Sequence, residues 1–354
     1  MIFQQSLIGN SRSGKEQWGD VVAARNAYEA NEIALASIQR QAGLKVNEGI
    51  IPQDVYQEFD NVTVERFRSD DGDTFLNDLL PLSRSVNIGK LIHKFRRSSD
   101  AGSAQTSMTG QMGVRFDQVE YNYDGSIIPI MDTGFFRNWR EWNAQSSEGF
   151  DALIDDQRES VAALRAHAAD SFMDGHKDND GKYIVVDGLS WKGMRNETTR
   201  VAQVDLGAGG VNFDFTDTAQ TYAAIELNFK EIRDTLYITN NCTKEAVYYI
   251  SREIMSNFER NSSESYSSEK VVNRLAQLMG VSAIKVTNKL TGNQIMAFPL
   301  SDGLVRPLVG MAVNTVAMPR PVYNSNYEFV VWGAIGWEVR TDYASRKCAL
   351  YASA

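Results

Sequence analysis

Cysteine is scarce in this sequence: Cys242 and Cys348 are the only two, and neither has a histidine or second cysteine at metal-binding spacing. Zinc sites and disulfide frameworks need such spacings, so we expect neither, and isolated thiols fit a reducing compartment. Long apolar runs are also lacking, since the run at 330–337 is far shorter than the roughly 20 residues that span a bilayer. The start shows no basic segment followed by an apolar core, as a secretory signal would. We therefore expect a soluble protein made in a cytoplasm, with no membrane contact.

An excess of positive charge is absent too. The chain has 36 lysines and arginines against 45 aspartates and glutamates, a net charge of −9 and a pI near 5.0. Proteins that read a nucleic acid sequence bring a basic surface to the phosphates, so this balance argues against that class. The 43% of hydrophobic and 23% of charged residues are typical of a globular protein.

Residues 9–16, GNSRSGKE, nearly match the phosphate-binding loop GxxxxGK[ST]. Glu16 stands where a hydroxyl group should bind Mg²⁺, and its carboxylate would repel the phosphates. No alternation of strands and helices follows. We interpret the segment as a flexible arm that leads into a helix, and keep a P-loop nucleotide-binding enzyme as an alternative.

Other motifs with catalytic or metal-binding spacing are equally incomplete. Residues 176–187 have the spacing of a calcium loop, but His176 occupies the first ligand position and Asp187 replaces the glutamate, so we expect a solvated turn. Ser267 and Lys270 form an SxxK pair without the partner motifs of serine–lysine enzymes. The only histidines, which have no serine and aspartate in a recognisable triad, are His93, His167 and His176. The sequence thus predicts no catalytic residue, no metal and no cofactor.

Apolar periodicity predicts two long helices. Residues 16–42 repeat an apolar side chain every seventh position and stop at Gly43. Residues 150–173 carry one mostly apolar face and stop at Gly175. At about 1.5 Å per residue the second helix should span roughly 35 Å, which is long for a globular domain.

Alternation of apolar and polar residues predicts a hairpin between them. The strands would be 114–121 and 127–131, joined by a turn at Tyr123-Asp124-Gly125. A two-stranded ribbon is marginal alone in water, so we expect it to lie on something else, such as a neighbouring subunit.

The second half alternates short strands with helices. We expect strands at 183–186, 235–239 and 248–250, a helix capped by Ser251, another that begins near Val271, a hairpin of 284–290 with 294–300, and closing strands at 328–340 and 348–352. The fold class is mixed α+β. The one basic run, 84–97, reads as a solvated face or an inter-subunit ion-pair strip, with contact to packaged DNA as the alternative.

Several segments resemble the major capsid proteins of tailed bacteriophages, in order along the chain. They are LPLSR (80–84), IGK (88–90) and FRRSSDAG (95–102) within 50–111, VDGLSWKGMRN (186–196), the region 249–257, LTGNQ (290–294), the region 319–324 and the strand 329–340. The resemblance implies the Hong Kong 97-like fold, which encapsulin nanocompartments share. Its parts would be an N-terminal arm and helix (1–45), a peripheral-domain lead-in (46–99), an extended E-loop (100–140), a spine helix with the peripheral domain (141–195), an axial domain (196–325) and closing strands (326–354).

The resemblance also implies a function. Copies would form hexamers and pentamers of an icosahedral head in the host bacterial cytoplasm, with scaffold and portal proteins as partners and double-stranded DNA contacted non-specifically inside the virion. An encapsulin-like compartment is the alternative with the same fold.

Large aromatic and charged side chains on and near the E-loop are the candidate contacts between subunits, because large rings carry most interface energy. They are Tyr121, Tyr123, Asp124, Phe135, Phe136, Trp139, Arg96 and Arg97. Some relatives cross-link through an E-loop lysine, yet this chain has no lysine between Lys94 and Lys177. We therefore expect a shell without covalent cross-links.

Overall fold

The computed structural model describes scattered residues between 19 and 37 and most of 73–354, the exceptions being 103, 105, 112, 114, 115, 148–151 and 263–268. The chain divides into two units, Met1–Phe67 and Arg68–Ala354. In the first unit the described residues are helical, and Arg25 pairs with Glu29 at 3.0 Å. They agree with the helix predicted over 16–42, whereas the loop at 9–16 lies outside the described residues.

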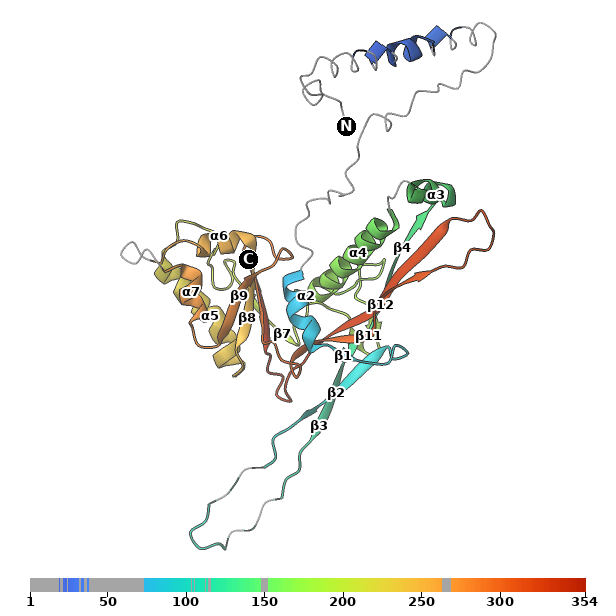
Figure 1. Ribbon diagram of the computed structural model, residues 1–354. Coiled ribbons are helices and arrows are strands. Elements are labelled where there is room, and N and C mark those ends of the chain that lie inside the picture. Colours follow the sequence, from blue (N-terminus) through green and yellow to red (C-terminus); the bar gives the residue numbers. More distant parts are fainter. Residues whose placement is uncertain are drawn as a thin grey trace. The chain divides into compact units, whose positions relative to one another are not determined.

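The second unit contains two larger sheets and two ribbons (Figure 1). The five-stranded sheet has the order β7 (Val201–Asp205), β13 (Ala349–Ser353), β10 (Gln294–Phe298), β8 (Ala246–Ile250) and β9 (Val281–Val286). The four-stranded sheet has the order β1 (Arg84–Ser85), β11 (Val305–Ala317), β12 (Tyr327–Val339) and β4 (Ile130–Arg137). The ribbons pair β2 (Ile92–Ser98) with β3 (Tyr121–Ile127) and β5 (Val185–Val186) with β6 (Leu189–Ser190).

The five-stranded sheet separates two apolar cores. One face packs on the helices α5 (Tyr222–Asp234), α6 (Arg252–Phe258) and α7 (Val271–Ala276). The other packs on α2 (Asp73–Leu79) and α4 (Ala152–Asp174). Side chains alternate across a strand, so Leu350 of β13 enters the first core and Tyr351 enters the second.

Helix α4 connects the two larger sheets. Phe172 is 2% exposed, and its ring contacts those of Phe75, Phe298 and Trp337 at centroid distances of 5.3, 5.8 and 4.9 Å. The helix ends at Gly175, whose φ of +72° and close approach to the carbonyl of Trp191 leave no room for a Cβ atom. The predicted helix over 150–173 is confirmed.

Several predictions in the second half are confirmed. Strands β8, β12 and β13 lie where they were expected, and the Ser251 hydroxyl accepts a hydrogen bond from the amide of Ile254 at the start of α6. Helix α7 begins at Val271, as predicted. Among the described helices, none is long and apolar enough to cross a membrane.

Three predictions about strands are wrong. The segment Thr235–Thr239, expected as a strand, is a π-helical turn (η3) that continues α5 and buries Leu236. Strands β9 and β10 form no hairpin, since β8 lies between them. Tyr123-Asp124-Gly125 is no turn: it lies inside β3, which pairs with β2. Gly125 is required there because a Cβ atom would lie 2.9 Å from the carbonyl oxygen of His93.

The expectation of unpaired cysteines is also wrong. Cys242 and Cys348 form a disulfide across 106 residues of sequence, with their Cα atoms 5.4 Å apart. Cys242 precedes β8 and Cys348 precedes β13. Both strands are antiparallel to β10 and therefore parallel to each other, so their first residues meet at one end of the sheet. This proximity depends on strand order, which the spacing of cysteines does not encode.

Truncating Phe172 to alanine should lower the free energy of unfolding by about 3–5 kcal/mol, because a large cavity opens between α4 and both sheets. Ile154 is the matched control on the same helix, since it is 54% exposed, and Ile154→Ala should change stability by less than about 0.5 kcal/mol. Urea unfolding followed by circular dichroism measures both. Equal losses for the two variants would contradict the packing described here.

Candidate functional site

The ribbon of β2 and β3 projects away from the rest of the second unit (Figure 1). Its pairs run from Ile92 with Ile127 to Ser98 with Tyr121, and the described residues of 99–120 continue beyond them without regular structure. Two large apolar side chains in this outer part are almost fully in solvent, Met108 at 100% and Phe116 at 93% exposed. A ribbon with no layer of its own to pack against is the feature that sets this unit apart from a self-sufficient domain.

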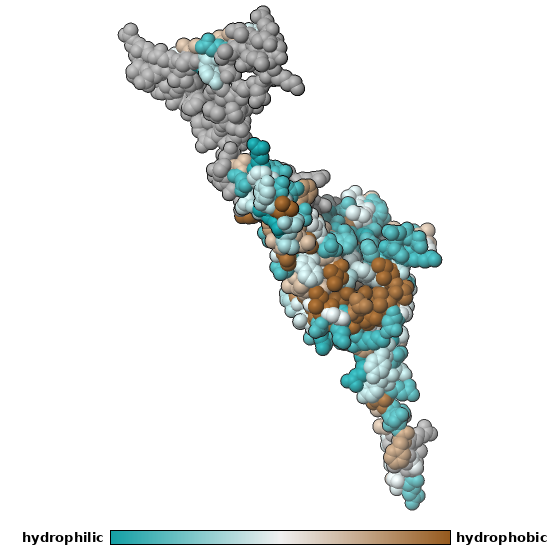
Figure 2. Space-filling model, turned by 90° about the vertical axis from the view of Figure 1, so that its right-hand side faces the viewer, coloured by the Kyte–Doolittle hydropathy of each residue, from teal (hydrophilic) through white to brown (hydrophobic). Residues whose placement is uncertain are grey.

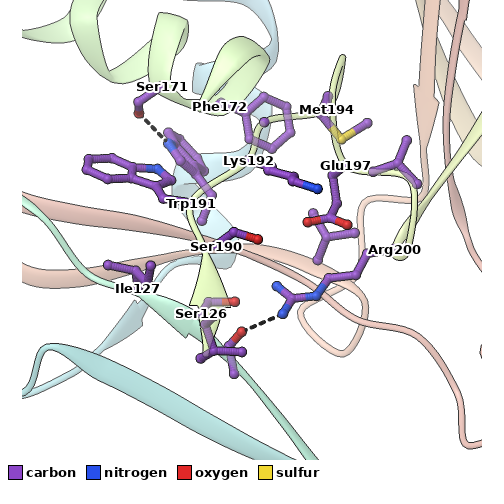
Figure 3. Close-up of a pocket in the computed structure, with 16 residues that line it drawn as sticks. Ser126, Ile127, Ser171, Phe172, Ser190, Trp191, Lys192, Met194, Glu197 and Arg200 are labelled. Carbon is purple, nitrogen blue, oxygen red and sulfur yellow. Dashed lines mark hydrogen bonds between the residues drawn. The ribbon is translucent and has the colours of Figure 1, made fainter. Parts of the chain in front are cut away.

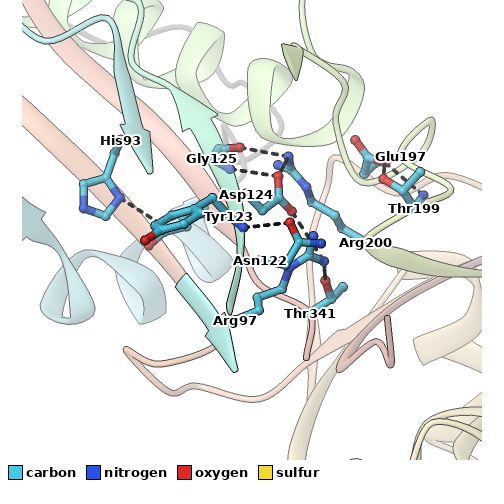
Figure 4. A network of polar contacts seen from close by, with 11 residues as sticks. His93, Arg97, Asn122, Tyr123, Asp124, Gly125, Glu197, Thr199, Arg200 and Thr341 are labelled. Atoms are coloured by element: carbon cyan, nitrogen blue, oxygen red, sulfur yellow. Dashed lines mark hydrogen bonds and ion pairs between the residues drawn. The ribbon is translucent and has the colours of Figure 1, made fainter. Parts of the chain in front are cut away.

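A carboxylate holds the base of the ribbon on the body (Figure 4). The side chain of Asp124 is 12% exposed and accepts a hydrogen bond from Arg200 at 2.6 Å. Arg97 lies 3.9 Å from the same carboxylate and donates to the hydroxyl of Thr341 at 2.8 Å. Because both arginines are only 16% exposed, water screens these charges weakly, and the pairs fix the direction in which the ribbon leaves the body.

A second buried carboxylate joins the ribbon to the body at another strand. Glu338 of β12 has no exposed surface, and its oxygens lie 2.6 Å from Arg306, 3.1 Å from Arg340 and 2.9 Å from Nδ1 of His93. Strand β2 carries His93, so this cluster joins the ribbon directly to the four-stranded sheet. A buried carboxylate is tolerated only with such partners, because desolvation of an unpaired charge is costly.

The small β5–β6 hairpin supports the ribbon from the side. Leu189 packs so closely on Gly125 that a Cβ atom added to this glycine would lie 3.0 Å from the Leu189 methyl carbon. The ammonium group of Lys94 donates to the carboxylate of Asp187 at 2.6 Å. The hydrogen bond from the Lys94 ammonium group lowers the pKa of the exposed Asp187 carboxyl. The basic run 84–97 is therefore engaged in part within its own subunit, through His93, Lys94 and Arg97.

A small cavity of about 40 Å³ lies among the ribbon base, α4 and the loop after β6 (Figure 3). Ser126, Glu197 and Lys192 line it, and the buried hydroxyl of Ser126 has no partner among the described residues. This volume has room for a few water molecules at most, and none for an ordinary substrate. No group of three or more metal-binding side chains was found among the residues that the structure describes.

Aromatic rings cover the far end of the four-stranded sheet. Phe135 stacks on Phe329 at 5.0 Å, and Trp142 of α3 (Trp139–Ser147) lies 4.6 Å from Tyr327. Arg137 anchors this end to α4 through Asp156 at 2.5 Å, and that hydrogen bond raises the pKa of the guanidinium group.

One face of the four-stranded sheet is apolar and partly open. Met131 packs toward α4, so its neighbour Ile130 points to the opposite face. The most exposed apolar residues of this sheet on that face are Ile130 (56%), Val316 (41%) and Phe136 (68%). In the view of Figure 2, apolar side chains gather in one broad patch on the body, next to the ribbon.

The candidate contact residues fall into two groups. Tyr121, Tyr123 and Phe136 are 58%, 62% and 68% exposed, and Arg96 is exposed and lies over the ring of Tyr121. Asp124 and Arg97 are engaged in the ribbon base, while Phe135 and Trp139 are partly buried. The structure contains one subunit, so a role of all eight between subunits stays a prediction.

Sequence reasoning missed the partners at the ribbon base, Arg200, Arg306 and Glu338. A signal existed for one of them, because Glu338 is a lone carboxylate within the apolar strand 329–339. Nothing in the sequence marked the two arginines, since they lie far from the ribbon along the chain.

Comparison with known proteins places the chain in a family. It belongs to a protein family of unknown function (DUF6260), whose model matches residues 45–352. No curated protein sequence matches it.

Solved structures similar to this chain are phage and related capsids. The capsid of Myoviridae phage XM1 is 11% identical with a TM-score of 0.63, covering 86% of this chain and 98% of its own. The capsid of a native GTA particle is 13% identical with a TM-score of 0.56, covering 87% and 100%. The capsid of cyanophage P-SCSP1u is 12% identical with a TM-score of 0.54, covering 87% and 96%. The chain has the fold of phage capsid proteins, which confirms the α+β class and the resemblance found in the sequence.

Replacing Glu338 by glutamine should lower the free energy of unfolding by about 3 kcal/mol, because Arg306 keeps a buried charge without its counter-ion. Asp187→Asn is the matched control at the same ribbon base, where the carboxylate and Lys94 are 60% and 56% exposed, and it should leave stability nearly unchanged. Chemical denaturation at pH 7 measures both variants. A Glu338→Gln protein as stable as the native one would show that the cluster does not hold the ribbon.

Proposed function

We propose that this member of the family is a major capsid protein of a tailed bacteriophage, a structural subunit that assembles with copies of itself. It forms the hexamers and pentamers of an icosahedral head, which is assembled in the bacterial cytoplasm and encloses double-stranded DNA. Scaffold and portal proteins are its further partners. Its function is to associate with copies of itself, and the proposal requires no catalytic residue and no cofactor.

The observation that carries the proposal is the outer part of the ribbon, which packs on no other layer among the described residues. Its base is fixed by buried ion pairs, whereas Met108 and Phe116 in its outer part are almost entirely in solvent. A fixed root and an unpacked end that exposes two large apolar side chains suit a segment that finds its second layer on another copy. The capsid fold supports the same conclusion independently.

The parts of the chain then have distinct roles. The segment 1–45 is an arm, the outer loop and β3 within 100–140 form the E-loop and pair with β2 of the lead-in 46–99, 141–195 form the peripheral domain with α4 as its spine, and 196–325 form the axial domain. Each subunit meets its neighbours through different surfaces, and such heterologous contacts close into rings and a shell. Many modest contacts made together give a stable particle.

The exposed aromatic residues are the proposed anchors of these contacts. Tyr121, Tyr123 and Phe136 offer large rings at little entropic cost, and Arg96 beside Tyr121 can form ion pairs across the interface. Arg97 and Asp124 act indirectly, by aiming the ribbon. Phe135 and Trp139 shape the surface on which a neighbour rests.

Two alternatives predict different particles. An encapsulin-like compartment would have the same fold and enclose protein cargo. A P-loop enzyme would lose nucleotide hydrolysis on Lys15→Ala, whereas a capsid subunit would still assemble. The net charge of −9 favours a shell that binds the enclosed DNA only weakly.

The protein expressed alone should form shells, tubes or rings visible by negative-stain electron microscopy, because its ribbon finds a partner only in further copies. Particles from infected or induced cells should contain nuclease-protected DNA. Protein cargo in place of DNA would favour the compartment, and a monomer at every concentration would refute both readings.

A paired variant separates assembly from folding. Tyr121→Ser with Tyr123→Ser should reduce the yield of particles at least tenfold and leave the thermal midpoint of the isolated chain unchanged, since both rings are largely in solvent. Tyr248→Phe, a buried position within the axial part, is the control and should assemble normally.

Mature particles boiled with detergent and reductant should give one monomer band on a denaturing gel. No lysine lies between Lys94 and Lys177, so the outer ribbon has no amine to form an isopeptide bond. A ladder of oligomers would contradict a shell held by non-covalent contacts.

A further inference from the structure

The disulfide lies at one end of the five-stranded sheet, where β8 and β13 begin together with the strands parallel to them, β9 and β7. Cys242 stands between η3 and β8, and Cys348 directly precedes β13. Lys347, the neighbour of Cys348, donates through its ammonium group to the carbonyl of Thr198 at 2.6 Å, shortly before β7. The disulfide therefore joins the start of β13 to the segment before β8, and the Lys347 hydrogen bond adds the segment before β7.

Strand β13 is the element that this bond secures. It lies between β7 and β10, and its side chains enter both apolar cores of the sheet, with Leu350 on one side and Tyr351 on the other. It comprises Ala349–Ser353. Detachment of this strand would open both cores at once, and a covalent tie just before its first residue opposes that opening.

Hydrogen bonds already position the two cysteines without help from the disulfide. The amide of Lys347 donates to the side chain of Asn240 at 3.1 Å, and the amide of Cys242 donates to the carbonyl of Leu236 at 3.0 Å. The Cα atoms lie 5.4 Å apart, within the usual range for a disulfide. The fold can thus form with both thiols reduced and receive the bond later.

We infer that Cys242 and Cys348 form a redox-controlled clamp on the C-terminal strand, open as two thiols during assembly and closed as a disulfide after the particle leaves the cell. The timing rests on the proposed function, because assembly in a bacterial cytoplasm takes place where thiols stay reduced and the released virion meets oxidising conditions. The clamp itself depends only on this chain.

Thiol–disulfide exchange closes the clamp. Cys348 is partly exposed and Cys242 is 4% exposed, so the Cys348 thiolate attacks a low-molecular-weight disulfide first and releases one small thiol. The Cys242 thiolate then displaces the second small thiol from the mixed disulfide. Two protein S–H bonds are lost and one S–S bond forms, while the small disulfide accepts two electrons and two protons and becomes two thiols.

The chemical state is tested on the purified full chain, kept in reductant or oxidised with glutathione disulfide. Alkylation with a polyethylene-glycol maleimide after denaturation should show two reactive thiols in the reduced protein and none in the oxidised one, which should migrate as a monomer on a non-reducing gel. Free thiols after oxidation, or disulfide-linked dimers, would overturn the clamp.

Thermal unfolding tests its effect. Oxidation should raise the midpoint by roughly 5–10 °C, because the bond closes a loop of about a hundred residues in the unfolded chain. The variant Cys242→Ser with Cys348→Ser should unfold at the midpoint of the reduced native chain, and this midpoint should be the same with and without oxidant. Cys242→Ser alone should retain glutathione on Cys348 and gain no stability. An oxidised native chain with the midpoint of the reduced one would overturn the proposed role.

The two proposals fail separately. Shells that form in both redox states without any disulfide would disprove the clamp and leave the capsid function standing. A chain that forms the disulfide and is stabilised by it, but never forms particles, would disprove the capsid function and leave the clamp standing. In cells whose thiols are blocked with a membrane-permeant alkylating agent before lysis, the assembled protein should carry two blocked thiols, and a disulfide there would contradict the timing.

Discussion

The architecture of the second unit depends on strand β12, because this strand uses both of its edges and both of its faces. Its edges pair with β11 and β4. One face sends Trp337 into the core beneath α4, where its ring meets Phe172, and the other sends Glu338 toward the ribbon. The two residues are adjacent in sequence and point to opposite sides because side chains alternate along a strand. One strand thereby couples the apolar core to the ion pairs that aim the ribbon.

The buried carboxylates explain how a ribbon without a core can keep a fixed direction. Asp124 and Glu338 are each surrounded by cations from distant parts of the chain, and both are largely removed from water. Such pairs add little net stability relative to apolar packing, but they have few alternative arrangements. Fixed geometry at the root gives the outer part of the ribbon a defined direction.

Similarity to capsid structures at low sequence identity has a physical basis. What the fold requires is a long helix against a sheet, a second sheet with apolar faces on both sides, and a projecting ribbon. Many sequences meet these requirements, because burial fixes which positions are apolar and which are polar but leaves a wide choice of residue at each position. Two features of this chain that such a pattern does not specify are the absence of lysine between Lys94 and Lys177 and the disulfide at the end of the five-stranded sheet.

Local patterns in the sequence were sufficient for the elements that depend on local physics. The apolar face of 150–173 predicted α4, Ser251 marked the start of α6, and the strands β8, β12 and β13 were evident from their composition. The α+β class followed from their order, and the resemblance to capsid proteins rested on short segments, such as 80–84 and 290–294, that occur in order along the chain. Pairing between distant segments was decided only by the tertiary structure. Asp124-Gly125 has the composition of a turn, yet it lies inside β3, because Arg200 and Leu189 meet it there from distant positions in the chain. The disulfide and the Glu338 cluster likewise join residues with no local relation. Periodicity reports which face of an element is buried, but the identity of the partner depends on how the elements are ordered in space.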